Sequence, residues 1–142
     1  MHEKREDVVQ TLVVLGATGN QGRAVLEHFA KHSFGFSLRG ITRNSQSKVA
    51  QELQRMGVDM VEADLEDLDS LCEAFSGATH IFATTDSNQN IFHAIQHPEV
   101  LEEGQTPRQF AREKELQQGK NIAEAASTTN SLQRVSPKRI TV

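Results

Sequence analysis

The stretch LVVLGATGNQG, residues 12–22, decides the fold of this chain. Four apolar residues lead into the glycines Gly16, Gly19 and Gly22, and an amphipathic run follows over residues 21–32. That order predicts a buried strand, a tight turn and a helix. Because the first amides of a helix have no intrahelical partner and its N-terminus carries partial positive charge, the turn predicts a binding site for a diphosphate.

Each glycine of this turn has a geometric reason. Gly16 lets the chain turn as it leaves the strand, Gly19 lets the backbone approach a phosphate, and Gly22 lets helix and strand pack closely. We also expect the other residues of the turn at the site: Ala17, Thr18, Asn20 and Gln21. The side chains of Asn20 and Gln21 can donate hydrogen bonds to the diphosphate. The alternative is an ordinary strand–helix turn that merely tolerates glycine.

The alternation of strand and helix patterns continues along the chain. Further strands are predicted at residues 38–43, 58–62 and 79–84, and further helices at residues 47–56, 67–75 and 112–127. Such alternation predicts an α/β fold with a Rossmann-like, doubly wound parallel sheet.

Arg43 stands at the tip of the second predicted strand. In a doubly wound sheet this position lies beside the adenosine ribose, where an acidic residue would bind the 2′-hydroxyl of NAD. A guanidinium there pairs instead with a 2′-phosphate. We therefore expect NADP(H) as the cofactor, with Ser47 adding a contact from the start of the next helix. The alternative is a solvated strand-end arginine.

The fourth predicted strand ends in hydroxyl side chains. Ligands of open α/β sheets bind at the carboxyl ends of the strands. We expect Thr84 and Thr85 to border the ribose and diphosphate of the cofactor.

Composition and charge exclude several classes of protein. The 142 residues suffice for one domain, and a net charge of −4 argues against a direct nucleic-acid surface. No apolar run approaches the ~20 residues of a membrane span, and the first residues lack the apolar core of a signal peptide. We expect a cytoplasmic protein with no membrane partner.

These segments together resemble the N-terminal half of the NmrA-like family, atypical members of the short-chain dehydrogenase/reductase superfamily. The matching segments are LVVLGATGNQG (12–22), LRGITRN (38–44), VDMVEADLEDLDSL (58–71), HIFATT (80–85) and ELQQGKNIAEAA (115–126). The resemblance implies that Asp64 and Leu65 lie against adenine, with Asp64 accepting from its amino group. It also implies that Gln117 and Lys120 lie near the cofactor, where Lys120 approaches a phosphate or the nicotinamide ribose.

The expected organisation has four parts: a charged lead-in over residues 1–9, the NAD(P)-binding domain over 10–127, an insert within it at about 88–110, and an atypical tail over 128–142. We expect the insert to be a loop with a short helix at 91–96. Apolar residues are scattered in the tail and Pro137 interrupts any strand there. Because the family continues into a fifth strand, the resemblance implies a truncated sheet, incomplete at the C-terminus.

His93 and His97 lie one helical turn apart, a spacing at which two imidazoles can share a metal. No third ligand is evident, so we expect no metal site.

The sequence leaves three hypotheses for function. The chain has no tyrosine, so it lacks the YxxxK proton donor usual in short-chain dehydrogenases, and we assign no catalytic residue. The resembled family includes reductases and cofactor-sensing regulators. The first hypothesis is an NADP-dependent oxidoreductase acting on an unknown small-molecule substrate. The second is a non-catalytic NADP-sensing module that binds a protein partner, and the third is an inactive truncated fragment.

Overall fold

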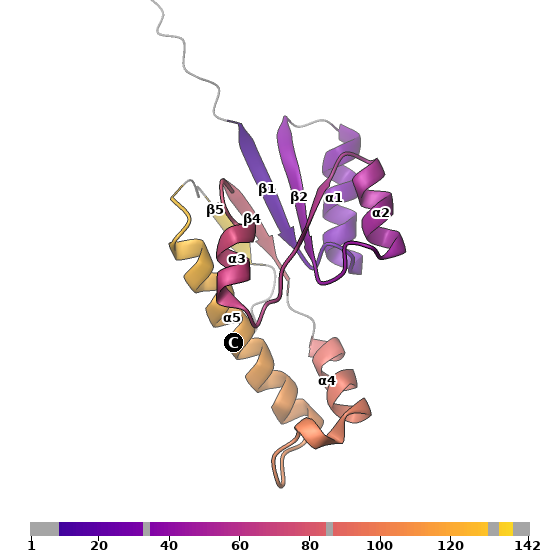
Figure 1. Ribbon diagram of the computed structural model, residues 1–142, viewed down its shortest axis with the longest axis vertical. Coiled ribbons are helices and arrows are strands. Elements are labelled where there is room, and N and C mark those ends of the chain that lie inside the picture. The colour runs from indigo at the N-terminus through magenta and orange to yellow at the C-terminus, as the bar shows by residue number, and fades with distance from the viewer. Residues whose placement is uncertain (1–8, 33–34, 85–86, 131–133, 138–142) are drawn as a thin grey trace, which may run out of the picture.

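The computed structural model describes residues 9–32, 35–84, 87–130 and 134–137 (Figure 1). The elements in chain order are β1 (Gln10–Leu15), α1 (Asn20–His32), β2 (Phe36–Thr42), α2 (Lys48–Arg55), β3 (Asp59–Glu62), α3 (Leu68–Ala74), β4 (His80–Ala83), α4 (Ser87–Gln96), a 3-10 turn η1 (Pro98–Val100), α5 (Pro107–Ser127) and β5 (Arg134–Pro137). Most of the predicted lead-in lies outside the described residues, as does Thr85.

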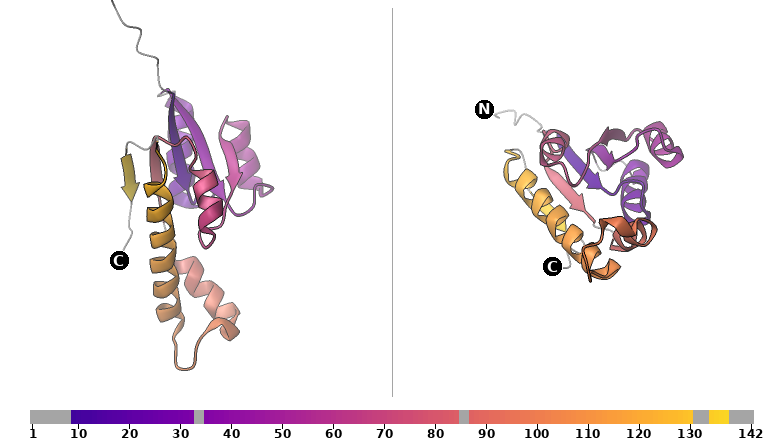
Figure 2. Two further views of the ribbon diagram at one scale, coloured as in Figure 1. Left: turned by 60° about the vertical axis from the view of Figure 1, so that its left-hand side comes forward. Right: turned by 60° about the horizontal axis from the view of Figure 1, so that its bottom comes forward.

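The strands form one parallel sheet in the order β3-β2-β1-β4-β5. The chain starts at the centre with β1, winds outward to β3, and then returns to place β4 on the other side of β1. Helices α1 and α2 cover one face of the sheet, while α3 and α5 cover the other (Figures 1 and 2). The predicted doubly wound α/β fold is therefore confirmed.

Strand β1 supplies the centre of the core on both faces. Val13 and Leu15 pack with buried residues of α3 and α5. Leu12 and Val14 pack on the opposite face with residues of α1 and α2. A strand covered on both faces requires apolar residues at consecutive positions, which explains the unbroken apolar run over residues 12–15.

The segment between β4 and the last helix is more helical than expected. Helix α4 starts at Ser87 rather than at residue 91, and α5 starts at Pro107 rather than at residue 112. The hydroxyl of Thr106 accepts from the Gln109 N–H at 3.2 Å, and the Gln109 side chain accepts from the Thr106 N–H at 2.9 Å. This capping box, with proline in the first turn, fixes the start of α5.

The expectation that Pro137 interrupts any strand in the tail is wrong. Residues 134–137 form β5, which pairs in parallel with residues 80–83 of β4. Strand β5 lies at the edge of the sheet, and Pro137 is its last residue. An edge position tolerates proline because a strand there has a neighbour on one side only.

No helix in the described ranges combines the length and apolar character needed to cross a bilayer.

A buried threonine joins β1 to the start of β4. The Thr79 hydroxyl accepts from the Thr11 N–H at 2.8 Å and lies 3.1 Å from the Thr11 carbonyl oxygen, to which it donates. Thr79 is 2% exposed. We expect Thr79→Val to lower the free energy of unfolding by about 1–3 kcal/mol, because it leaves the Thr11 N–H buried without that acceptor.

Urea denaturation of the wild type, Thr79→Val and Thr79→Ser measures this effect. The serine variant keeps the hydroxyl and is the matched control, so it should be the more stable of the two. Equal stability of the two variants would contradict the assignment.

Candidate functional site

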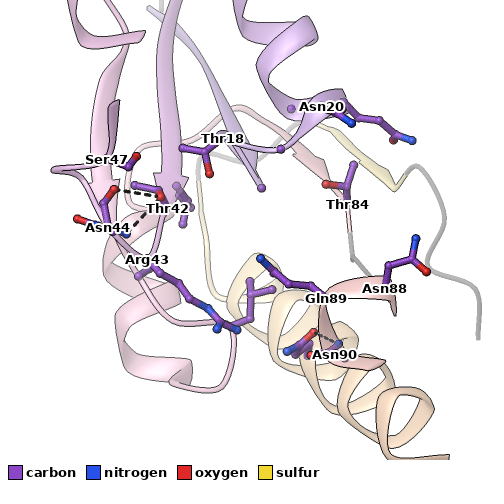
Figure 3. A pocket seen from close by; sticks show the side chains of 18 of the residues that line it. Thr18, Asn20, Thr42, Arg43, Asn44, Ser47, Thr84, Asn88, Gln89 and Asn90 are labelled. Carbon is purple, nitrogen blue, oxygen red and sulfur yellow. Dashed lines mark hydrogen bonds between the residues drawn. The ribbon is translucent and has the colours of Figure 1, made fainter. Parts of the chain in front are cut away.

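A pocket of about 750 Å³ opens at the carboxyl ends of β1, β2 and β4, facing α4 and α5 (Figure 3). It lies where the strand order reverses between β1 and β4, the usual position of ligands in open α/β sheets. Ten of the residues predicted for the site line it: Gly16, Thr18, Gly19, Asn20, Gln21, Gly22, Arg43, Ser47, Leu65 and Thr84. Its volume falls in the range of ligand pockets, roughly 300–1,000 Å³.

The backbone of the glycine turn is fixed by three hydrogen bonds. The Ala17 N–H donates to the Ile41 carbonyl at 3.3 Å, and the Gly19 N–H donates to the Gly16 carbonyl at 3.0 Å. The first bond in the helical pattern of α1 runs from the Arg23 N–H to the Gly19 carbonyl at 2.9 Å. The amides of residues 20–22 precede it, and such amides at a helix start have no intrahelical partner and can bind an anion.

Close packing around the turn requires glycine at two positions. A Cβ at Gly22 would overlap the carbonyl group of Gly16, so α1 could not approach the end of β1. A Cβ at Gly40 in β2 would lie 2.9 Å from Ala17 Cβ and 2.7 Å from Met60 Sδ. Gly22 therefore has the packing role that the sequence suggested. Gly40 lets β2 pass beneath the turn.

Ala17 belongs to this packed layer and not to the pocket lining. The residue is 0% exposed and packs in the cluster formed with α1 and α2. Its methyl group packs between the turn and the helices α1 and α2.

Arg43 follows β2 and extends into the pocket (Figure 3). It is exposed and is the one cationic residue of the described lining. Among the residues that the structure describes, no carboxylate forms an ion pair with its guanidinium. Its positive charge is therefore available to a ligand.

The turn after Arg43 carries Ser47 at the start of α2. The Ser47 hydroxyl accepts from the Ala50 N–H at 3.2 Å and caps the helix, while its N–H donates to the Asn44 carbonyl at 3.3 Å. Asn44 also lines the pocket. Ser47 can still donate its hydroxyl proton to a ligand.

Two predicted site residues in the loop after β3 (Asp59–Glu62) are placed differently from each other. Leu65 lines the pocket, whereas Asp64 does not. The Asp64 carboxylate accepts from the Glu66 N–H at 2.9 Å, and the Asp64 N–H donates to the Ser70 hydroxyl at 3.1 Å. Local hydrogen bonds of the loop therefore engage Asp64.

Helices α4 and α5 supply a polar wall that sequence reasoning missed. It consists of Asn88, Gln89 and Asn90 from the first turn of α4 and Glu115 and Gln118 from α5. Gln118 is 3% exposed, and its side-chain oxygen accepts from Asn90 Nδ2 at 3.5 Å. The spacing of three between Glu115 and Gln118 places them on one helix face, which was the available signal.

The resemblance pointed to the neighbouring positions Gln117 and Lys120. Lys120 is exposed on α5 and does not line the pocket. Gln117 Nε2 donates to Asn121 Oδ1 at 3.1 Å, and Asn121 Nδ2 donates to the Leu65 carbonyl at 2.9 Å. Asn121 thereby holds the Leu65 loop against α5, at the side of the pocket.

The model of the NmrA-like family matches residues 9–141. The chain belongs to the NmrA-like family. This NmrA-like chain is 36% identical over 93 residues to the NmrA-like family domain-containing oxidoreductase ptmS of Penicillium ochrochloron, covering 66% of the chain and 28% of that relative. It is 38% identical over 96 residues to the NmrA-like family domain-containing oxidoreductase cpsB of Aspergillus campestris, covering 67% of the chain and 28% of that relative.

Solved structures of the same fold include NmrA, a negative transcriptional regulator. Its complex with NADP superposes with a TM-score of 0.66 at 21% identity, covering 92% of this chain and 33% of that one. Its complex with NAD gives a TM-score of 0.62 at 20% identity, with the same coverage. The NmrA-like chain thus spans about a third or less of the length of these relatives and structures.

The crowding at Gly22 predicts a stability effect. We expect Gly22→Ala to lower the free energy of unfolding by about 1–3 kcal/mol, because the methyl group must displace backbone of the turn. The matched control is Gly19→Ala, whose Cβ would lie 3.3 Å from the Gly16 carbonyl oxygen and meet far less crowding. Thermal unfolding compares them, and equal loss at both positions would contradict the packing argument.

Proposed function

We propose that this chain binds a nicotinamide dinucleotide as the cofactor-binding part of an NmrA-like oxidoreductase, and that it prefers NADP(H). The observation that supports the proposal is the convergence of two features on one pocket. The amides at the start of α1, which follows β1, face the pocket, and so does the guanidinium of Arg43, which follows β2. The first suits a diphosphate and the second a 2′-phosphate.

The residues present fit such a group. Gly19 and Gly22 leave bare backbone at the start of α1, so the diphosphate can approach the amides there. Leu65 offers an apolar contact for adenine, and the Thr84 hydroxyl offers a partner for a ribose. Contacts from Thr85, the Asp64 carboxylate and Lys120 remain predictions.

A bound nicotinamide would supply or accept a hydride. The polar wall of α4 and α5 faces the same pocket and provides the carboxylate of Glu115 and the amides of Gln89 and Gln118. These groups can orient a polar ligand by accepting and donating hydrogen bonds. We propose a small molecule as the substrate.

A second candidate is a non-catalytic NADP-sensing module that binds a protein partner. Two observations favour it: the sequence has no tyrosine, and the structurally similar NmrA is described as a negative transcriptional regulator. Cofactor turnover distinguishes the candidates. An oxidoreductase would oxidise NADPH when a carbonyl or enone substrate is added, whereas a sensor would bind it unchanged. An inactive fragment would bind neither NADPH nor NADH.

Calorimetric titration of the chain with NADPH and NADH tests cofactor binding. We expect NADPH to bind more tightly, and Arg43→Ala to weaken NADPH binding about tenfold with little effect on NADH, because a charge-assisted hydrogen bond to the 2′-phosphate is lost.

The control is Arg55→Ala, which removes an exposed arginine of α2 that does not line the pocket. It should leave both affinities unchanged. Absence of binding to folded protein would refute the proposed function, and equal losses for NADPH and NADH would refute the role of Arg43.

A further inference from the structure

Glu62, the last residue of β3, holds the turn that follows the neighbouring strand β2. Its Oε1 accepts two hydrogen bonds from Ser45, from the N–H at 3.0 Å and from the hydroxyl at 2.7 Å. These bonds lower the pKa of the Glu62 carboxyl below its usual range, with the backbone N–H making the larger contribution. The side chain is therefore a carboxylate at neutral pH.

Ser45 does not itself line the pocket, but it lies between residues that do. Arg43 and Asn44 precede it, Ser47 follows it, and all three line the pocket. The Gln46 N–H donates to Asn44 Oδ1 at 2.9 Å, and the Ser47 N–H donates to the Asn44 carbonyl. The Gln46 and Ser47 amides therefore donate within the turn, whereas the amide and the hydroxyl of Ser45 both donate to Glu62.

We propose that Glu62 limits the preference of the site for a phosphorylated adenosine ribose. This inference rests on the proposed function. A 2′-phosphate beside Arg43 would compete with the Glu62 carboxylate for the two donors of Ser45. It would also be repelled by the carboxylate charge. A ribose with a free 2′-hydroxyl carries no charge there and loses little from either effect.

Cofactor preference is then a balance between two adjacent strand ends. Arg43 after β2 attracts the phosphate, while Glu62 at the end of β3 opposes it. The strands are neighbours, with Thr42 and Glu62 paired in register, yet Arg43 and Glu62 form no ion pair with each other in the described structure. The two charges therefore do not neutralise each other through a direct ion pair.

The decisive variant is Glu62→Gln in the full chain, because the amide oxygen still accepts from Ser45 while the negative charge is removed. We expect calorimetry to show NADPH binding strengthened on the order of fivefold, with NADH affinity unchanged. Adenosine 2′,5′-bisphosphate, which carries only the adenosine end of the cofactor, should gain affinity to the same extent. Glu62→Ala also frees both Ser45 donors and should raise the ratio of NADPH to NADH affinity as well.

The matched control is Asp59→Asn, which removes the same charge at the opposite end of β3. Asp59 lies beside Arg39, with 3.9 Å between Oδ2 and Nε, and its side chain is 71% exposed. It should leave the affinity ratio unchanged. If the wild type binds both cofactors and both Glu62 variants leave the ratio unchanged or lower, the inference is overturned while the proposed function stands. If the folded wild type binds neither, both are overturned.

Discussion

The approach of α1 to the end of β1 is the constraint on which the site depends. Because position 22 carries no side chain, the first turn of α1 lies against the Gly16 carbonyl, and its first amides, which have no intrahelical partner, lie at the carboxyl edge of the sheet. The layer below must accommodate the same turn. Ala17 is fully buried under it, and β2 passes beneath Ala17 with a glycine at position 40. One steric requirement therefore sets residues in the turn, in α1 and in β2.

The pocket that results has a simple charge distribution. Its described lining is mostly neutral and polar, with Arg43 as its cation on the β2 side and Glu115 as its acid on α5. Neutral amide and hydroxyl groups, together with backbone N–H groups, fill the space between them. Such a lining binds a large polar ligand through many hydrogen bonds and uses few charges to orient it.

Sequence reasoning found the parts of this site that depend on backbone geometry. The glycine turn and Arg43 were predictable because position along a βα unit determines where they lie. Asp64 was judged by its position alone, but its carboxylate is engaged by the backbone of its own loop. The α4 part of the wall was missed because the polar residues 88–90 and the prolines suggested a loop. Gln118 faces the pocket because the first half of α5 packs against α4, which lies beyond the strand ends (Figure 1).

The strand order also determines when the pocket can exist during folding. Strand β1 pairs with β2 and with β4, and its bond to Thr79 joins residues 68 positions apart. The lining runs from Gly16 to Gln118, so most of the chain must be in place before the pocket is complete. Non-local parallel pairing of this kind folds slowly compared with local helical contacts. A ligand of this pocket consequently acts late in folding, by stabilising the assembled sheet rather than by nucleating it.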